Sequence, residues 1–164
     1  MIDHMTLHVR DVERSIAFYT AALAPLGYVV KTHHESTLGF GVDDGTPHSD
    51  FYVSPLDEGA ANSVPNNAAN DAANGTAEQP HGQSSQQPYA PTHIAFLAPD
   101  RAAVQALYDA ALAAGGHDNG TPGPRPYHAG YYAAFVLDPD GNNIEAVVDW
   151  SHDAGFAVPI KTAQ

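Results

Sequence analysis

The 164-residue chain contains no cysteine and only six lysine and arginine residues, against 19 aspartate and glutamate residues. The absence of cysteine excludes disulfides, thiolate nucleophiles and cysteine-ligated metal sites. The formal net charge of -13 disfavours partners such as nucleic acid or an anionic membrane surface, because both need clustered basic side chains. No apolar run approaches the roughly 20 residues that span a bilayer, and the first residues contain no apolar signal stretch. We therefore expect a soluble, cytoplasmic, globular protein.

Two segments of the chain, Ile2–Leu23 and Pro91–Leu112, repeat one pattern. Each begins with alternating apolar residues, which is typical of a half-buried strand. In each segment an aspartate suited to cap a helix follows, Asp11 or Asp100, and apolar residues then recur at helical spacing. The repeat predicts two copies of one structural module.

Short strands are expected after each predicted helix, because runs of apolar and β-branched residues alternate there with turn residues. The expected strands are Tyr28–His33, Leu38–Val42 and Asp50–Ser54 in the first half, and Tyr131–Leu137 and Asn143–Val148 in the second. The Gly- and Pro-rich segment 117–130 predicts a short strand followed by a long loop. Each module therefore has the order β-α-β-β-β, and the fold class is α+β.

The domain organisation is predicted from composition. One domain is expected, with module one at 1–56, module two at 91–150 and a tail at 151–164. The intervening segment 57–90 consists mostly of Ala, Asn, Gln, Ser, Gly and Pro, and such a segment cannot bury enough apolar surface to offset its ordering entropy. It is expected to be a flexible low-complexity insert, with a lid over a site as the alternative.

Period-two alternation assigns candidate functional residues to the faces of the predicted strands. His4 and His8 share the polar face of the first strand. His93 is the residue of the fifth strand that corresponds to His4, and Glu145 lies on the last strand. His4, His93 and Glu145 are expected to project into one cavity. Two imidazoles and one carboxylate suit a divalent metal, either Fe²⁺ in a dioxygenase or Zn²⁺ as a Lewis acid.

Four features together carry a family resemblance: the segments IDHMTLHVRDVERSIAFY, THIAF and LDPDGNNIEAV, and the duplicated β-α-β-β-β pattern. The chain resembles the vicinal oxygen chelate superfamily, which comprises glyoxalases, bleomycin-resistance proteins and extradiol dioxygenases. The resemblance covers the chain except the insert 57–90. It implies two modules forming a cupped, mostly antiparallel sheet around a central cavity. It also implies a divalent metal held by the first and last strands of the modules.

The resemblance carries metal-ligand roles onto His4, His93 and Glu145. The fourth family position falls on Tyr52, or on Asp50 if the register differs by two residues. A phenol ionises near pH 10 and is a poor ligand for most divalent ions. A tyrosine here argues against the glyoxalase I reaction, in which a carboxylate at this point moves a proton. Tyr52 is instead expected to line the pocket, as a substrate-binding or catalytic hydrogen-bond donor.

Further candidates lie on the first strand and near the last two strands. His8 is expected either to bind substrate or to pack inside the sheet. Tyr131 is a candidate for substrate binding and His128 for general acid catalysis, with a packed loop as the alternative for both. Arg125 could hold a substrate carboxylate or phosphonate, or be solvated in its loop.

The leading functional hypothesis is a divalent-metal-dependent enzyme of lyase, isomerase or dioxygenase type that acts on a small oxygen-bearing molecule. The ion would be Fe, Mn, Ni or Zn, and the family resemblance makes a homodimer possible. The alternative is a metal-free binding protein of the bleomycin-resistance type that sequesters a drug or metabolite. Fold resemblance does not choose between them, because function depends on the site.

Overall fold

The computed structural model describes residues 2–56, 90–127 and 129–149. The chain divides into two compact units: one joins Met1–Pro55 to Pro91–Gln164, and the other is Leu56–Ala90. The low-complexity insert, except for its last residue, and the tail 151–164 lie outside the described residues. The first unit contains both predicted modules.

The first module forms a four-stranded sheet with strand order β1-β4-β3-β2. Strand β1 pairs with β4 in parallel, and the other two pairings are antiparallel. Its elements are β1 (Met5–Val9), α1 (Val12–Leu23), a short 3₁₀ helix (Ala24–Leu26), β2 (Tyr28–His34), β3 (Thr37–Val42) and β4 (Phe51–Pro55).

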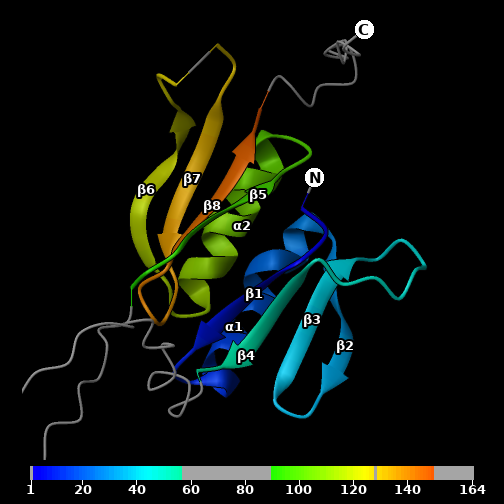
Figure 1. The fold of residues 1–164 in the computed structure, drawn as a ribbon. Helices are drawn as coiled ribbons and strands as arrows, with labels where there is room; N and C mark the ends of the chain where they lie inside the picture. Colours follow the sequence, from blue (N-terminus) through cyan, green and yellow to red (C-terminus); the bar gives the residue numbers. More distant parts are fainter. Residues whose placement is uncertain (1, 57–89, 128, 150–164) are drawn as a thin grey trace, which may run out of the picture. The chain divides into compact units, whose positions relative to one another are not determined.

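The second module repeats this topology, with strand order β5-β8-β7-β6 and one parallel pairing, between β5 and β8. Its elements are β5 (His93–Leu97), α2 (Arg101–Ala113), β6 (His117–Pro124), β7 (Tyr132–Leu137) and β8 (Asn143–Val148). Figure 1 shows the two modules, each with its helix beside its sheet. The predicted α+β fold with two β-α-β-β-β modules is confirmed.

Both helices begin where the sequence predicts. The carboxylate of Asp11 accepts a hydrogen bond from the backbone N–H of Arg14, and that of Asp100 accepts one from Ala103. Each bond satisfies a backbone donor that the first helical turn leaves free. After α1, Gly27 ends the short 3₁₀ helix with a φ of 82°, a left-handed conformation that glycine adopts without strain.

The main difference from the predicted strands lies in segment 117–130, where β6 continues to Pro124 through residues expected to form a loop. Its pairing with β7 shifts twice, between Asp118 and Gly120 and between Gly120 and Gly123. These irregularities let a Gly- and Pro-rich segment remain paired without regular strand geometry.

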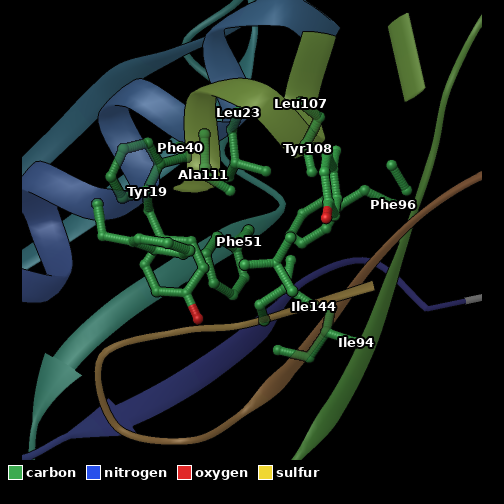
Figure 2. Close-up of a cluster of buried hydrophobic side chains, with 14 of the residues drawn as sticks. Tyr19, Leu23, Phe40, Phe51, Ile94, Phe96, Leu107, Tyr108, Ala111 and Ile144 are labelled. Carbon is green, nitrogen blue, oxygen red and sulfur yellow. The ribbon is translucent and has the colours of Figure 1, made fainter. Parts of the chain in front are cut away.

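The two modules share one hydrophobic core. The ring of Phe51 from β4 contacts that of Phe96 from β5 at a centroid distance of 5.3 Å, and Tyr19 from α1 contacts Phe51 at 5.0 Å. Figure 2 shows these aromatic rings with aliphatic side chains from both modules. No helix in the described parts of the chain is long and apolar enough to cross a membrane.

A buried polar contact joins α1 to the turn between β7 and β8. Tyr19 donates its hydroxyl hydrogen bond to Asp138, 2.7 Å away. Asp138 also accepts hydrogen bonds from the side-chain amide of Asn142 and from the backbone N–H groups of Asp140 and Asn142. These bonds fix the turn that leads into β8, and β8 carries Glu145.

Candidate functional site

The polar faces of both sheets lie opposite the shared core. On β1, Leu7 and Val9 are buried while His8 is exposed, and β5 alternates in the same way. Because Phe51 and Phe96 point into the core, their alternate neighbours point away from it. His8, Tyr52, His93 and Glu145 therefore lie on outward faces of the two sheets.

On the second sheet, the structure brings together His93, Glu145 and Tyr131. Nε2 of His93 lies 3.0 Å from Oε2 of Glu145, and the Tyr131 hydroxyl donates to Oε1 of Glu145 at 2.7 Å. The side chain of His93 is half exposed, whereas Glu145 is only 3% exposed. Neighbouring parallel strands, β5 and β8, position the histidine and the carboxylate.

Tyr131 is held as a neutral hydrogen-bond donor. Burial raises its pKa above the usual value for a phenol, and the hydrogen bond and negative charge of Glu145 raise the pKa further. Both effects disfavour the phenolate beside a carboxylate. Tyr131 thus carries a proton at neutral pH, directed at the buried carboxylate.

Asn143 completes this cluster and was not among the predicted site residues. Its side-chain nitrogen lies 2.7 Å from Nδ1 of His93, and its oxygen accepts a hydrogen bond from Asn119 at 3.0 Å. Alternation along β8 could have identified it, because Asn143 is two residues before Glu145 and shares its face.

The separation of His93 and Glu145 fits a shared divalent cation. Two ligand atoms about 2.1 Å from an octahedral ion and at right angles to each other lie about 3 Å apart. The distance between Nε2 and Oε2 is 3.0 Å, which is also an ordinary hydrogen-bond length. An imidazole and a carboxylate suit Zn²⁺, Mn²⁺, Ni²⁺ and Fe²⁺. Within residues 2–56, 90–127 and 129–149, no group of three or more metal-ligating side chains occurs.

His4, the third predicted ligand, lies with the first sheet instead. It precedes β1, its Nδ1 lies 2.8 Å from a carboxylate oxygen of Asp3, and its ring meets that of Tyr52 edge to face at 5.7 Å. The hydrogen bond from His4 lowers the pKa of Asp3. His8, also on β1, has Nδ1 3.2 Å from the Pro55 carbonyl oxygen. The structure brings His4 and Tyr52 together, apart from His93 and Glu145.

Asp50, the alternative to Tyr52 at the fourth ligand position, forms a hydrogen bond with Tyr28. The Tyr28 hydroxyl donates to Asp50 at 3.1 Å, and the Tyr28 ring packs edge to face on Phe96 in the core. Burial, and then the charge and hydrogen bond of Asp50, raise the pKa of Tyr28 to about 12. This pairing ties Asp50 to the core side of the first sheet.

Arg125 lies directly after β6 and is partly buried rather than solvated. One of its terminal nitrogens, Nη2, donates to the carbonyl oxygens of Thr121 and Ala133. Its guanidinium carbon lies over the Phe135 ring, 5.1 Å from the centroid. His128, the predicted general acid, lies outside the described residues.

Comparison with solved structures finds the same fold in other proteins. The chain is similar to a glyoxalase/bleomycin resistance protein from Albidiferax ferrireducens T118, with 25% identity, 90% of this chain and 98% of that chain covered, and a TM-score of 0.62. It is also similar to a putative glyoxalase from Bacillus halodurans, with 20% identity, 91% and 96% covered, and a TM-score of 0.59. For lactoylglutathione lyase from Agrobacterium tumefaciens the identity is 19%, the coverage 90% and 92%, and the TM-score 0.55.

A search of curated protein sequences finds no match to the chain. A family model, in contrast, matches the sequence. The model describes the glyoxalase/bleomycin resistance protein/dioxygenase superfamily and matches residues 1–146, nearly the whole chain. The duplicated β-α-β-β-β modules agree with that match. The chain belongs to the glyoxalase/bleomycin resistance protein/dioxygenase superfamily.

Proposed function

We propose that the protein is a divalent-metal-dependent enzyme, of lyase, isomerase or dioxygenase type, that acts on a small oxygen-bearing molecule beside His93 and Glu145. The observation that carries the proposal is the 3.0 Å separation of His93 Nε2 and Glu145 Oε2, which suits two ligands of one ion. A bound ion would supply Lewis-acid stabilisation of developing negative charge on a substrate oxygen.

The surrounding side chains have roles that do not depend on the identity of the ion. Asn143 holds the His93 ring. Tyr131 donates a hydrogen bond to Oε1 of Glu145 and so positions the carboxylate. Glu145 is buried, so its charge needs either these donors or a cation.

A second copy of the chain would supply the third ligand. The His4–Tyr52 pair and the His93–Glu145 pair lie on outward faces of different sheets. In a twofold homodimer the first sheet of one copy can face the second sheet of the other, which forms two equivalent sites. His4 of one copy would then join His93 and Glu145 of its partner, and Tyr52 would line the same site.

Metal binding tests the proposal directly. Metal-depleted protein is titrated with Fe²⁺, Mn²⁺, Ni²⁺ and Zn²⁺ by calorimetry, with elemental analysis of the bound ion. We expect about one ion per chain, and at least about a tenfold loss of affinity in His93→Ala and Glu145→Gln. His33→Ala is the matched control, because His33 is exposed on β2. Equal affinity in all four proteins would contradict the metal proposal.

Mixed dimers test the contribution of the second copy. The His4→Ala and His93→Ala chains are each expected to lose the ion. A mixed dimer of the two regains one intact site, made from His4 of one chain with His93 and Glu145 of the other. About one ion per mixed dimer is therefore expected. No recovery on mixing would contradict the shared site while leaving the metal proposal standing.

One observation favours metal-free sequestration as a second candidate. Both carboxylate oxygens of Glu145 already accept hydrogen bonds within the chain, from His93 and Tyr131, so the cluster is satisfied without an ion. The net charge of -13 would attract a cationic ligand. This candidate becomes the leading one if metal-depleted protein takes up none of the four ions.

A further inference from the structure

A row of side chains crosses the second sheet from the His93–Glu145 pair toward Arg125. Glu145 on β8 pairs with Phe135 on β7, and Phe135 pairs with Gly120 on β6. The Arg125 guanidinium lies over Phe135, 5.1 Å from the ring centroid, and the His93 ring lies 6.2 Å from the same ring. Because strands lie about 4.8 Å apart, the row from β8 to β6 is about 10 Å long.

The positive charge of Arg125 has no anionic partner among the described residues, whose ion pairs all involve other side chains. Its Nη2 donates to the carbonyl oxygens of Thr121 and Ala133 at 2.6 and 3.1 Å, and its buried Nε has no hydrogen-bond partner in that part of the chain. A guanidinium stays charged at any physiological pH. Partial burial of an uncompensated charge costs free energy, which an anion would recover.

Glycines keep side chains away from this end of the row. At Gly120, where φ is +154°, an added Cβ would lie only 2.9 Å from Cδ2 of Phe135 and 3.3 Å from Nη2 of Arg125. At Gly123 the nearest described atoms to an added Cβ are the Thr121 carbonyl oxygen at 3.9 Å and Nη1 of Arg125 at 4.0 Å. A β-carbon at Gly123 would be in ordinary van der Waals contact with Nη1, so a longer side chain there would lie against Nη1, and the hydrogen bonds of the guanidinium to Thr121 and Ala133 are made by Nη2 alone.

We propose that this row binds a small organic monocarboxylate, with the carboxylate at Nη1 of Arg125, a flat apolar middle beside Phe135, and an oxygen at the His93–Glu145 pair. A single anionic charge fits because one guanidinium provides one compensating charge, and a protein of net charge -13 repels more highly charged anions. For the oxygen-binding end, this inference rests on the proposed function. The carboxylate end rests on the contacts of Arg125 alone.

The test uses 4-acetylbenzoate, whose ketone oxygen and carboxylate are separated by one benzene ring, and its neutral counterpart 4-acetylbenzamide. Both are titrated by calorimetry or NMR into metal-depleted wild-type protein, Arg125→Met and Arg125→Lys. Wild type is expected to bind the acid about tenfold more tightly than the amide, with a preference that falls as salt increases. Arg125→Met is expected to lose that preference while keeping its affinity for the amide, and Arg125→Lys to retain part of it.

The outcomes separate this inference from the metal proposal. Comparing the affinities of wild type for the acid and the amide needs no variant. This comparison therefore tests the inference even if Arg125→Met is unstable without the hydrogen bonds to Thr121 and Ala133. Wild type that binds acid and amide equally, or Arg125→Met that keeps the acid preference, overturns the carboxylate site. Metal uptake by the same proteins reports on the proposed function independently, because Arg125 is not among the ligands.

Discussion

Asn143 fixes the orientation of His93, with its side-chain nitrogen 2.7 Å from Nδ1 of the imidazole. An amide nitrogen only donates, so Nδ1 accepts and the ring proton lies on Nε2, directed at Glu145. A cation bound at Nε2 would require the opposite tautomer, with the proton on Nδ1. The amide of Asn143 serves either form, because rotating it presents an oxygen in place of the nitrogen.

Asn143→Leu is predicted to weaken metal binding by roughly 10- to 100-fold, because a metal-binding histidine depends on the group that holds its other nitrogen. Calorimetric titration with Zn²⁺ measures the loss. Nitrogen NMR of the His93 ring provides a readout that general destabilisation would not reproduce. The wild-type ring is expected to carry its proton on Nε2 without metal and on Nδ1 with metal, whereas the variant ring without metal populates both tautomers.

Asn119→Ala is the matched control for this prediction. Asn119 donates a hydrogen bond to the side-chain oxygen of Asn143, and Asn143 in turn contacts the His93 ring. It should lower the affinity by no more than a few-fold. Wild-type affinity in Asn143→Leu would contradict the role assigned to Asn143.

Tyr19→Phe is predicted to destabilise the protein by roughly 1–3 kcal/mol, because it removes a donor to a buried carboxylate. The hydroxyl of Tyr19 lies 2.7 Å from Asp138, and both residues are almost wholly buried. Urea unfolding measures the change. Tyr127→Phe is the control, since Tyr127 is 64% exposed and loss of its hydroxyl should leave stability nearly unchanged. Equal stability of the two variants would rule out an energetic role for the contact between α1 and the β7–β8 turn.

Local patterns in the sequence were sufficient for the fold. Alternation in Met5–Val9 and in His93–Leu97 predicted which side chains are buried, and the structure confirms it. Asp11 and Asp100 cap the helices as predicted. These features depend on neighbours in sequence, for which the spacing of apolar residues is a direct physical signal.

The candidate site was only partly predictable, because it depends on which strands become neighbours. Pairing of β5 with β8 brings His93 to Glu145. Alternation places His4 on a polar face but does not say that this face belongs to a different sheet. Arg125 was expected in a loop, and its contact with Phe135 depends on the irregular pairing of β6, which composition does not reveal.

Phe51→Ala is predicted to cost roughly 3–5 kcal/mol of folding free energy, because the cavity lies where the two modules share a core. The Phe51 ring is 1% exposed and contacts the rings of Tyr19 and Phe96. Tyr52→Phe is the matched control on the outward face of the same strand, with an expected change within about 0.5 kcal/mol. Denaturant unfolding compares the two, and a similar loss in both would contradict the assignment of faces on β4.

Alkaline pH is predicted to weaken the Tyr28–Asp50 contact. The pKa of Tyr28 is raised to about 12 in the folded protein, against about 10 in an unfolded chain. Between these values the unfolded state releases its proton while the folded state keeps it, so stability falls as pH rises. The contribution of Tyr28 is complete below about pH 10 and is lost progressively toward pH 12.

Urea unfolding of wild type and Tyr28→Phe at about pH 9 and about pH 11 measures this contribution, because the phenylalanine has no proton to lose. Other tyrosines with raised pKa values, Tyr108 and Tyr131, act in both proteins and cancel in the comparison. Wild type is expected to lose on the order of 1 kcal/mol more than the variant over this interval, after allowance for the partial exposure of Tyr28. Parallel losses in the two proteins would show that the phenol of Tyr28 is as free to ionise in the folded protein as in the unfolded chain.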